Sequence, residues 1–324
     1  MRAAVFCFSD SGAALADKIC KHLRLEKDCI HMRIPDDMET LFSENDALIF
    51  IGACGISVRA VAPFIKIKTT DPAVVVIDDQ GKYAIPILSG HIGGANELAR
   101  MLAKLIGAEA VITTATDIAG KFSADSWAVQ NNCIISSMEM AKEVSAAILK
   151  KDIPVCSEYN LPQPLPKGLK YGESGDIGIY IGLHDRAPFE KTLRLIPRIL
   201  TLGIGCRRGT EKNHLLSAVK SVFEGNGLDI RAVSRIASID IKKDEKGLRS
   251  LAEELDAELI FYSAQELNAV EGDFAESDFV KNTVGTGNVC ERSAMHDGGK
   301  LVVKKHSVEG VTVAASEKEW RIVF

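Results

Sequence analysis

The sequence predicts an α/β protein in which two α/β domains are joined by a small middle module. Near-continuous runs of valine and isoleucine alternate with helical patterns at both ends of the chain, which is typical of mostly parallel sheets covered by helices on both faces. At 324 residues the chain is also too long for one ordinary core. We expect an N-terminal domain with a mostly parallel sheet over 1–127, a middle module over 128–194, and a C-terminal domain over 195–324.

The elements of the N-terminal domain follow from apolar periodicity. Short apolar runs bounded by turn residues indicate strands. Apolar spacings of three and four indicate helices, most clearly over 95–106, where Leu98, Leu102 and Leu105 share one face. The expected strands cover 3–8, 29–34, 46–51, 73–77, 83–88 and 110–114, and the expected helices cover 12–23, 57–64 and 95–106.

The rest of the chain carries a similar pattern after a less regular middle. The segment LPQPLPKGLKYGESGD is rich in proline and glycine and predicts a long loop or a boundary. After it, LRLIPRILTLGIG predicts one strand with a proline near its start. The other expected strands cover 153–155, 177–183, 236–241, 259–263, 301–306 and 311–315, and the expected helices cover 138–150, 210–223 and 246–255.

The composition argues against several classes of protein. A net charge of −5, without a basic stripe interleaved with aromatic residues, predicts no nucleic-acid binding. No apolar run reaches the ~18 residues of a membrane span, and the first run breaks at Ser9 and Asp10. We therefore expect a cytoplasmic protein without a membrane segment. Eight scattered cysteines without a C-x-x-C pair, and seven histidines without paired spacing, predict neither disulfides nor a protein-bound metal.

Three glycine-rich segments share one predicted design, an apolar strand followed by a tight turn and a helix. They are YAIPILSGHIGGANELA, RILTLGIGCRRGTEKNHLL and NTVGTGNVCERSA. Glycine lets a ligand approach the backbone closely, and the N–H groups of a helix start favour anions. One such loop alone is more often a structural turn. Three together, with Arg207 and Arg208 in one and His91 in another, favour binding of anions such as carboxylates.

The second segment has an alternative interpretation. Gly203, Gly205 and Gly209 form G-x-G-x-x-x-G between a strand and a helix, a variant of the dinucleotide-binding motif. That motif needs an acidic residue at the end of the next strand. Asp229 precedes that strand and Asp240 lies too far along the chain. An oxidoreductase that binds NAD(P) is therefore a weaker alternative.

Longer stretches resemble a known family. GACGISVRAVAPFIKIKTTDPAVVVIDDQGKYAIPILSGHIGGANELARMLAKLIGAEAVITTATD is similar to the N-terminal domain of CbiG proteins. LGIGCRRGT, ASIDIKKDEKGL and VGTGNVCERSA are similar to their C-terminal domain, which is shared with CobE proteins. The resemblance covers about 46–127 and 196–316, in the order expected for one chain.

The resemblance implies a step of anaerobic cobalamin synthesis. CbiG proteins open the ring A δ-lactone of cobalt-precorrin-5A and release acetaldehyde, giving cobalt-precorrin-5B. The implied substrate is a cobalt-containing corrinoid that carries the cobalt itself, with no cofactor of the protein's own, and other enzymes of the pathway are implied partners. A corrinoid carrier without activity is the alternative, because CobE-like domains occur as separate proteins.

A large macrocycle with many carboxylates needs several separated anion sites, and the glycine-rich segments are the expected suppliers. Thr210 is in addition the expected N-cap of the helix that follows it. The residues expected to bind substrate are Gly55, Arg59, Ser89, Gly90, Gly93, Gly94, Asn96, Gly205, Cys206, Arg207, Arg208, Thr210, Gly285, Thr286 and Gly287.

Lactone opening needs activated water and donors for an oxyanion. His91 is the first candidate base because histidine titrates near neutral pH, and the backbone amides around Gly93 and Gly94 are the expected oxyanion donors. The alternative for His91 is a loop histidine that hydrogen-bonds a carbonyl or contacts substrate without proton transfer. Glu291 is the second candidate base, and its alternative is to stabilise a helix start.

The remaining polar candidates have simpler expected roles. Cys206 lies beside two arginines but lacks an apparent partner base, so a nucleophilic role is disfavoured. Lys66 and Lys68, like Arg59, either neutralise carboxylates or are solvated. The aspartates expected to act in turns or caps rather than in a cleft are Asp71, Asp117 and Asp125.

Overall fold

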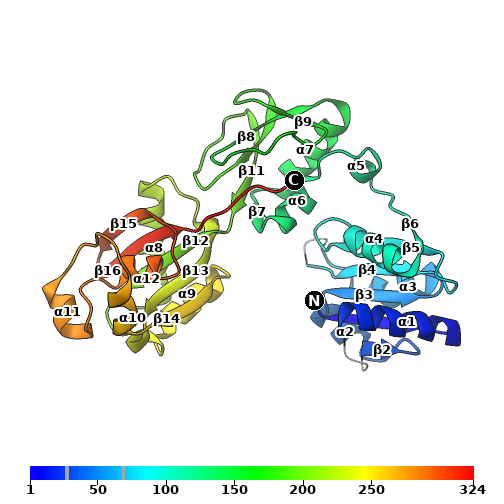
Figure 1. Cartoon of the computed structure of the whole chain (residues 1–324), viewed down its shortest axis with the longest axis horizontal. Helices are drawn as coiled ribbons and strands as arrows, with labels where there is room; N and C mark the ends of the chain where they lie inside the picture. The colour runs from blue at the N-terminus through cyan, green and yellow to red at the C-terminus, as the bar shows by residue number, and fades with distance from the viewer. Residues whose placement is uncertain (26–28, 68–69) are drawn as a thin grey trace. The chain divides into compact units, whose positions relative to one another are not determined.

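A computed structural model describes residues 1–25, 29–67 and 70–324. Its contacts divide the chain into two compact units, Met1–Trp127 and Ala128–Phe324, and each unit is described by itself. The described residues form three sheets with helices between their strands (Figure 1), which confirms the predicted α/β class. One of these sheets is built from the middle segment and belongs to the second unit. The boundaries expected near 127 and 194 stay a prediction.

The first unit is a sheet in the order β2-β1-β3-β4-β5-β6, in which every neighbouring pair is parallel except β4 and β5. Its strands are β1 (Ala3–Cys7), β2 (Ile30–His31), β3 (Ala47–Ile51), β4 (Ala73–Ile77), β5 (Tyr83–Leu88) and β6 (Glu109–Ala110). Its helices are α1 (Asp10–Leu23), α2 (Met38–Glu44), α3 (Cys54–Val61), α4 (Ala95–Ile106) and α5 (Ala115–Ile118), and α6 (Ala124–Gln130) begins in this unit.

Alternate residues of the central strands enter two separate cores. In β3, Ile49 and Ile51 pack with residues of α1 and α4, whereas Leu48 and Phe50 pack with residues of α2 and α3. Every residue of β1, β3 and β4 is buried. Strands buried on both faces have no polar side to alternate with, which explains their continuous apolar runs.

The direction of β5 decides where its glycine-rich loop lies. β5 pairs antiparallel with β4, so that Leu88 lies opposite Val74 and Ala84 lies opposite Ile77. The loop after β5 therefore lies at the side of the sheet where the amino ends of β4 and its parallel neighbour β3 are. The segment after β3 lies at the opposite side, where the carboxyl ends of those two strands are.

The second unit contains two five-stranded sheets, in the orders β7-β11-β10-β8-β9 and β14-β13-β12-β16-β15. The first consists of β7 (Cys133–Ile135), β8 (Ile153–Ser157), β9 (Leu169–Tyr171), β10 (Ile177–Ile181) and β11 (Lys191–Pro197), with α7 (Met138–Lys150). The second consists of β12 (Leu200–Gly205), β13 (Val233–Ile239), β14 (Glu258–Tyr262), β15 (Lys300–Val308) and β16 (Val311–Glu317). Its helices are α8 (Lys212–Gly225), α9 (Lys246–Glu254), α10 (Ala264–Ala269), α11 (Asp278–Val284) and α12 (Cys290–Met295).

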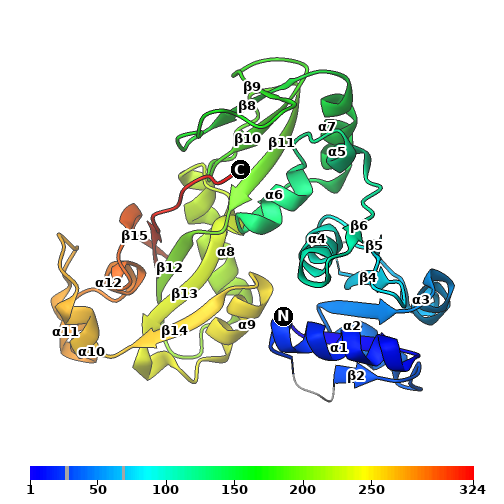
Figure 2. The same ribbon diagram turned by 45° about the vertical axis from the view of Figure 1, so that its right-hand side comes forward.

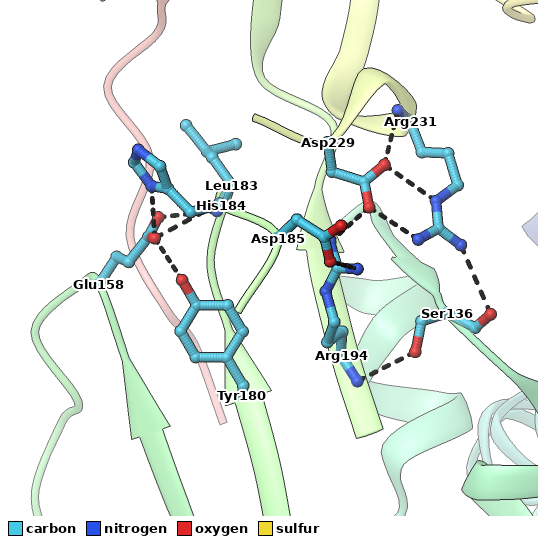
Figure 3. Close-up of polar contacts among 9 residues, drawn as sticks. All are labelled: Ser136, Glu158, Tyr180, Leu183, His184, Asp185, Arg194, Asp229 and Arg231. Atoms are coloured by element: carbon cyan, nitrogen blue, oxygen red, sulfur yellow. Dashed lines mark hydrogen bonds and ion pairs between the residues drawn. The ribbon is translucent and has the colours of Figure 1, made fainter. Parts of the chain in front are cut away.

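The two sheets of the second unit share one hydrophobic core. Ile134 of β7 and Ile196 of β11 pack in the same cluster as Leu200 of β12 and residues of α8 and α9. Figure 2 shows α8 and α9 on one side of the C-terminal sheet and α10 and α12 on the other. Arg194 of β11 also pairs with Asp229, which joins the two sheets electrostatically (Figure 3).

Two sequence predictions about this unit are wrong. The segment LRLIPRILTLGIG forms two strands in different sheets, because β11 ends at Pro197 and β12 begins at Leu200. Proline has no N–H to donate to a ladder, so the pairing of β11 stops there. The third glycine-rich segment follows a helix, α11, rather than a strand.

Among the described residues, no helix is both long and apolar enough to cross a membrane.

Candidate functional site

The loop between β5 and α4 is a tight turn whose backbone N–H groups donate hydrogen bonds to carbonyl groups of the same loop. Ser89 has a φ of 55° and Gly94 a φ of 79°, and Gly94 occupies the N-cap of α4 without a side-chain cap. The Gly94 N–H donates to the carbonyl oxygen of His91 at 2.9 Å. The N–H groups of Ala95 and Asn96 donate to the carbonyl oxygens of Ser89 and Gly90, respectively. The expectation that the Gly94 amide is a free oxyanion donor is therefore wrong.

The other glycines of this loop allow close packing. A Cβ on Gly93 would lie 2.3 Å from the Ser89 Cβ, and one on Gly90 would lie 2.8 Å from the Asn96 Oδ1. Ser89 and Asn96 are both buried. The Ser89 hydroxyl donates to the Asp71 carbonyl at 2.9 Å. These two side chains, which the sequence suggested for ligand binding, hold the loop against its neighbours.

His91 lies between two carboxylates. Its Nε2 is 2.9 Å from Asp117 Oδ2, and its Nδ1 is 3.8 Å from Asp125 Oδ2. Asp117 also pairs with Arg100 and accepts a hydrogen bond from the Asn96 amide at 3.1 Å. The side chains of His91 and Asp117 are 19% and 15% exposed to solvent, respectively. The cluster is therefore partly open to solvent. The prediction that Asp117 and Asp125 serve only in turns or caps misses this arrangement.

The carboxylates set the charge of His91. The hydrogen bond with Asp125 raises the pKa of His91, burial opposes that rise, and Asp117 adds to it. Burial alone would raise the pKa of Asp117, but its bonds to Arg100 and His91 hold it below the ordinary value. These directions favour the imidazolium form of His91 and the ionised form of Asp117. In this state His91 is placed to donate a proton, whereas a base needs a ring nitrogen with a free lone pair.

The fold does not bring Gly55 and Arg59 to His91. Both residues lie in α3, which follows β3, at the edge of the sheet opposite the loop after β5. Arg59 is exposed and donates to the Gly55 carbonyl at 3.0 Å.

The nearby lysine and aspartate candidates are surface or turn residues. Lys66 is exposed, and its backbone N–H donates to the Asp71 carboxylate at 3.1 Å. The turn role expected for Asp71 is thereby confirmed. Lys68 lies outside the described residues.

The second glycine-rich loop connects β12 to α8. Thr210 is not the N-cap, since Glu211 occupies that position, and the Thr210 hydroxyl instead donates to the Arg207 carbonyl at 2.8 Å. The Gly209 N–H donates to Glu245 at 2.8 Å, which ties the loop to the start of α9. Because the chain continues extended through Glu211, α8 begins later than the sequence suggested.

A cavity of about 580 Å³ opens beside this second loop. Arg208 and Thr210 line it together with Lys212 at the start of α8 and Lys246 at the start of α9. Neither helix has a side-chain cap, so their first N–H groups add to the positive potential. Glu211, Asp244 and Glu245 also line it, and Lys212 pairs with Glu254 at 3.0 Å, so the cationic groups at the cavity are Arg208 and Lys246 beside several carboxylates. Arg207 is exposed and does not line it.

Cys206 does not have the properties of a nucleophile. Burial raises the pKa of its thiol, whereas a reactive cysteine needs a lowered one.

The glycines of the dinucleotide-like pattern have packing roles. A Cβ on Gly203 would lie 1.8 Å from the carbonyl oxygen of Cys290, where α12 crosses β12. A Cβ on Gly205 would lie 2.4 Å from the Thr312 hydroxyl on β16. These glycines are needed for the sheet and helix to meet, so they give no support to a dinucleotide site.

The third glycine-rich loop is the most buried. Gly285 ends α11 with a φ of 80°, a Cβ on Gly287 would clash with Glu276, and Thr286 is fully buried. Glu291 is also buried, and its two oxygens accept hydrogen bonds from the backbone N–H groups of Ala275 at 3.0 Å and Lys305 at 2.8 Å. These contacts tie Glu291 to neighbouring segments rather than to the start of its own helix, the alternative expected for it, and they do not support a role as a base.

His91 is the predicted site residue that the structure places in a polar cluster. Its carboxylate partners, Asp117 and Asp125, were expected only in turns or caps. Asp117 and Asp125 lie 26 and 34 positions after His91, beyond any spacing rule for a helix or hairpin. The only signal was their occurrence in the short polar segments around α5 and α6.

Comparison with known proteins gives one consistent result. Residues 36–117 match the family model described as "Cobalamin synthesis G N-terminal", and residues 200–316 match "Cobalamin synthesis G C-terminus". A cobalt-precorrin-5A hydrolase from Salmonella typhimurium is 34% identical, with 96% of each chain covered. One from Priestia megaterium is 32% identical over 91% of this chain and 84% of the relative. A solved cobalamin biosynthesis protein G homologue from Sulfolobus solfataricus covers 98% of this chain and is itself 97% covered, at 25% identity and a TM-score of 0.42.

Proposed function

Because this chain belongs to the CbiG family of cobalamin synthesis proteins, we propose that it is a hydrolase that acts on cobalt-precorrin-5A. The observation that carries the proposal is the similarity to named cobalt-precorrin-5A hydrolases along nearly the whole chain. In the proposed reaction water adds to the ring A δ-lactone, the ring C–O bond breaks, and a two-carbon unit leaves as acetaldehyde. Cobalt arrives as part of the substrate, and the protein contributes no cofactor of its own.

We assign His91 the role of proton donor in lactone opening, so that it acts as a base only in the following step and not from the start, as the sequence suggested. The two carboxylates beside it favour the imidazolium. When the tetrahedral intermediate collapses, the departing ring oxygen needs a proton, and a neighbouring imidazolium supplies one. Neutral His91 then takes that proton back from the alcohol. The alkoxide forms the C=O bond of acetaldehyde as the adjacent C–C bond breaks, and the electron pair left on the macrocycle is protonated by water.

The substrate carboxylates need cationic partners outside the reacting ring. The cavity at Arg208 and Thr210 offers a guanidinium, the Lys246 ammonium and two helix starts, although Glu211, Asp244 and Glu245 also line it. Guanidinium groups pair with carboxylates through two parallel hydrogen bonds. We propose that this cavity holds one or more acidic side chains of the macrocycle. Contacts with other enzymes of the pathway remain a prediction.

Acetaldehyde release tests this function directly. Purified protein is incubated under anaerobic conditions with cobalt-precorrin-5A, and acetaldehyde is measured by the NADH consumed in a coupled alcohol dehydrogenase assay. We expect acetaldehyde and a corrinoid product in equal amounts, and none with heat-denatured protein. Binding of intact substrate without acetaldehyde would contradict the proposal and favour the alternative of a corrinoid carrier. Saturable NADH binding, followed by fluorescence without the coupling enzyme, would instead favour the oxidoreductase alternative.

A further inference from the structure

A second cluster of polar side chains lies in the second unit, where the middle sheet meets the C-terminal sheet. It borders a cavity of about 670 Å³. The cavity is lined by side chains from both sheets and their loops, among them Glu158, Tyr159, His184, Arg186, Leu228 and Val302. None of these residues belongs to a motif in the sequence, and the proposed reaction does not use them.

Glu158 is a fixed anion at the inner end of this cluster. Its carboxylate accepts hydrogen bonds from the Tyr180 hydroxyl, from the Leu183 N–H at 2.7 Å and from the His184 N–H at 3.3 Å. These three donors hold the carboxylate of Glu158 in one position.

The ring of His184 is oriented by that carboxylate. His184 Nδ1 is 2.6 Å from Glu158 Oε1 (Figure 3). An ionised carboxylate can only accept, so Nδ1 carries the hydrogen and the lone pair of the neutral ring is on Nε2. Within the described ranges Nε2 has no hydrogen-bond or ion-pair partner. The side chain is 48% exposed and borders the cavity.

A histidine held in this way is typical of metal ligands. Such histidines coordinate through one nitrogen while the other donates to a carboxylate, which fixes the ring and makes the coordinating nitrogen more basic. The described residues contain no group of three or more side chains that could hold an ion by themselves. A single histidine suits a metal whose equatorial positions are already filled by a macrocycle.

We propose that His184 Nε2 is an axial ligand to the cobalt of the bound corrinoid and that Glu158 positions the ring. This inference rests on the proposed function for the identity of the metal. The cavity has mixed walls, in which Val302 and the largely buried Leu228 are apolar and Glu317 is a second carboxylate. Arg186, an exposed guanidinium at the same cavity, suits a peripheral carboxylate.

The test uses the full chain and the electron paramagnetic resonance spectrum of cobalt(II). Cobalt-precorrin-5A is added to the protein under anaerobic, reducing conditions, and acetaldehyde is measured in parallel. Bound cobalt with an axial histidine shows superhyperfine splitting from one nitrogen, and the pattern changes when the protein is labelled with nitrogen-15 histidine. We expect His184→Gln to lose the splitting and to bind the corrinoid more weakly. His296→Gln is the matched control, since the Nδ1 of His296 also lies near a carboxylate, 3.0 Å from Asp297, but His296 does not line the cavity.

The outcomes separate this inference from the proposed function. Nitrogen splitting that survives in folded His184→Gln, or acetaldehyde release from a wild-type complex without nitrogen splitting, would overturn the inference and leave the function intact. Splitting that depends on His184 in a complex that releases no acetaldehyde would support the inference and contradict the function. Thermal melting of both variants checks that each is folded, which is expected because about half of the His184 side chain is exposed.

Discussion

His91 and His184 are both held by carboxylates, but the two environments leave different parts of each ring accessible. Both ring nitrogens of His91 face carboxylates, Asp117 at 2.9 Å and Asp125 at 3.8 Å. Among the described residues, His184 faces a carboxylate with Nδ1 alone, Glu158 at 2.6 Å, and its side chain borders a cavity. The first arrangement stabilises a cation that can give up a proton, and the second presents a lone pair. Whether a histidine is suited to donate a proton or to offer a lone pair therefore depends on how many of its ring nitrogens face a carboxylate.

The largest expected effect is on the rate of acetaldehyde release after removal of His91. His91→Gln should lower kcat by ~100-fold or more, because general acid catalysis contributes about that much, while the corrinoid still binds. Steady-state kinetics at saturating cobalt-precorrin-5A measures this. His22→Gln, at an exposed site in α1 of the same unit, should be unaffected. A near-normal kcat with a raised KM would make His91 a binding residue.

The next effect concerns binding at the second histidine. Glu158→Gln removes the charge that orients His184 and should weaken corrinoid binding by about 10-fold, a size typical for the partner of a metal-ligating histidine. Equilibrium titration of the corrinoid absorbance measures it. Glu143→Gln, which removes an exposed carboxylate paired with Lys191 on the surface, is the control. Equal affinities for the two variants would mean that Glu158 has only a structural role.

A smaller effect is a shift in the dependence of the rate on pH. If the protonated form of His91 is the active one, kcat falls as pH rises through its raised pKa. Asp125 is the main cause of that rise, so Asp125→Asn should move the fall in kcat to lower pH. The pH profiles of wild type and Asp125→Asn, measured at saturating substrate, show the shift. A rate that instead increases with pH over the same range would restore the role of base.

The smallest effect is expected from the arginines of the second loop. Replacing Arg207 and Arg208 by glutamine should weaken corrinoid binding by roughly 2- to 10-fold at low salt, because exposed ion pairs contribute little. The loss should shrink as salt is added, since screening weakens the wild-type contacts. Arg321→Gln, at an exposed site near the end of the chain, is the control. An affinity that does not change at low salt would remove these arginines from the binding site.

The parts of the fold that could be predicted from the sequence are those set by local patterns. α4 and α7 occupy the expected residues 95–106 and 138–150, because apolar spacing and nearby glycine or serine define them. The direction of β5 is also predictable, because only the turn 78–82 separates it from β4 and a parallel neighbour would need a longer crossover. That direction separates the segment at Gly55 from the loop of His91.

The candidate sites show the limit of such local patterns. His91 could be selected because it stands in a glycine-rich loop, but its charge depends on Asp117 and Asp125, which α5 and α6 bring back to it. His184 and Glu158 stand 26 positions apart with no motif around them. They meet because β8 and β10 are parallel neighbours whose ends lie together. Contacts across a sheet of this kind carry no signal in a single sequence.

The most direct test of the difference between the two histidines is a single-turnover experiment on preformed complexes. His91→Gln and His184→Gln are each loaded to saturation with cobalt-precorrin-5A, and both acetaldehyde release and the cobalt(II) spectrum are followed. We expect His91→Gln to keep the nitrogen splitting and release acetaldehyde ~100-fold more slowly than wild type, and His184→Gln to lose the splitting. A His91→Gln complex that turns over at the wild-type rate, together with unchanged splitting in His184→Gln, would contradict both assignments.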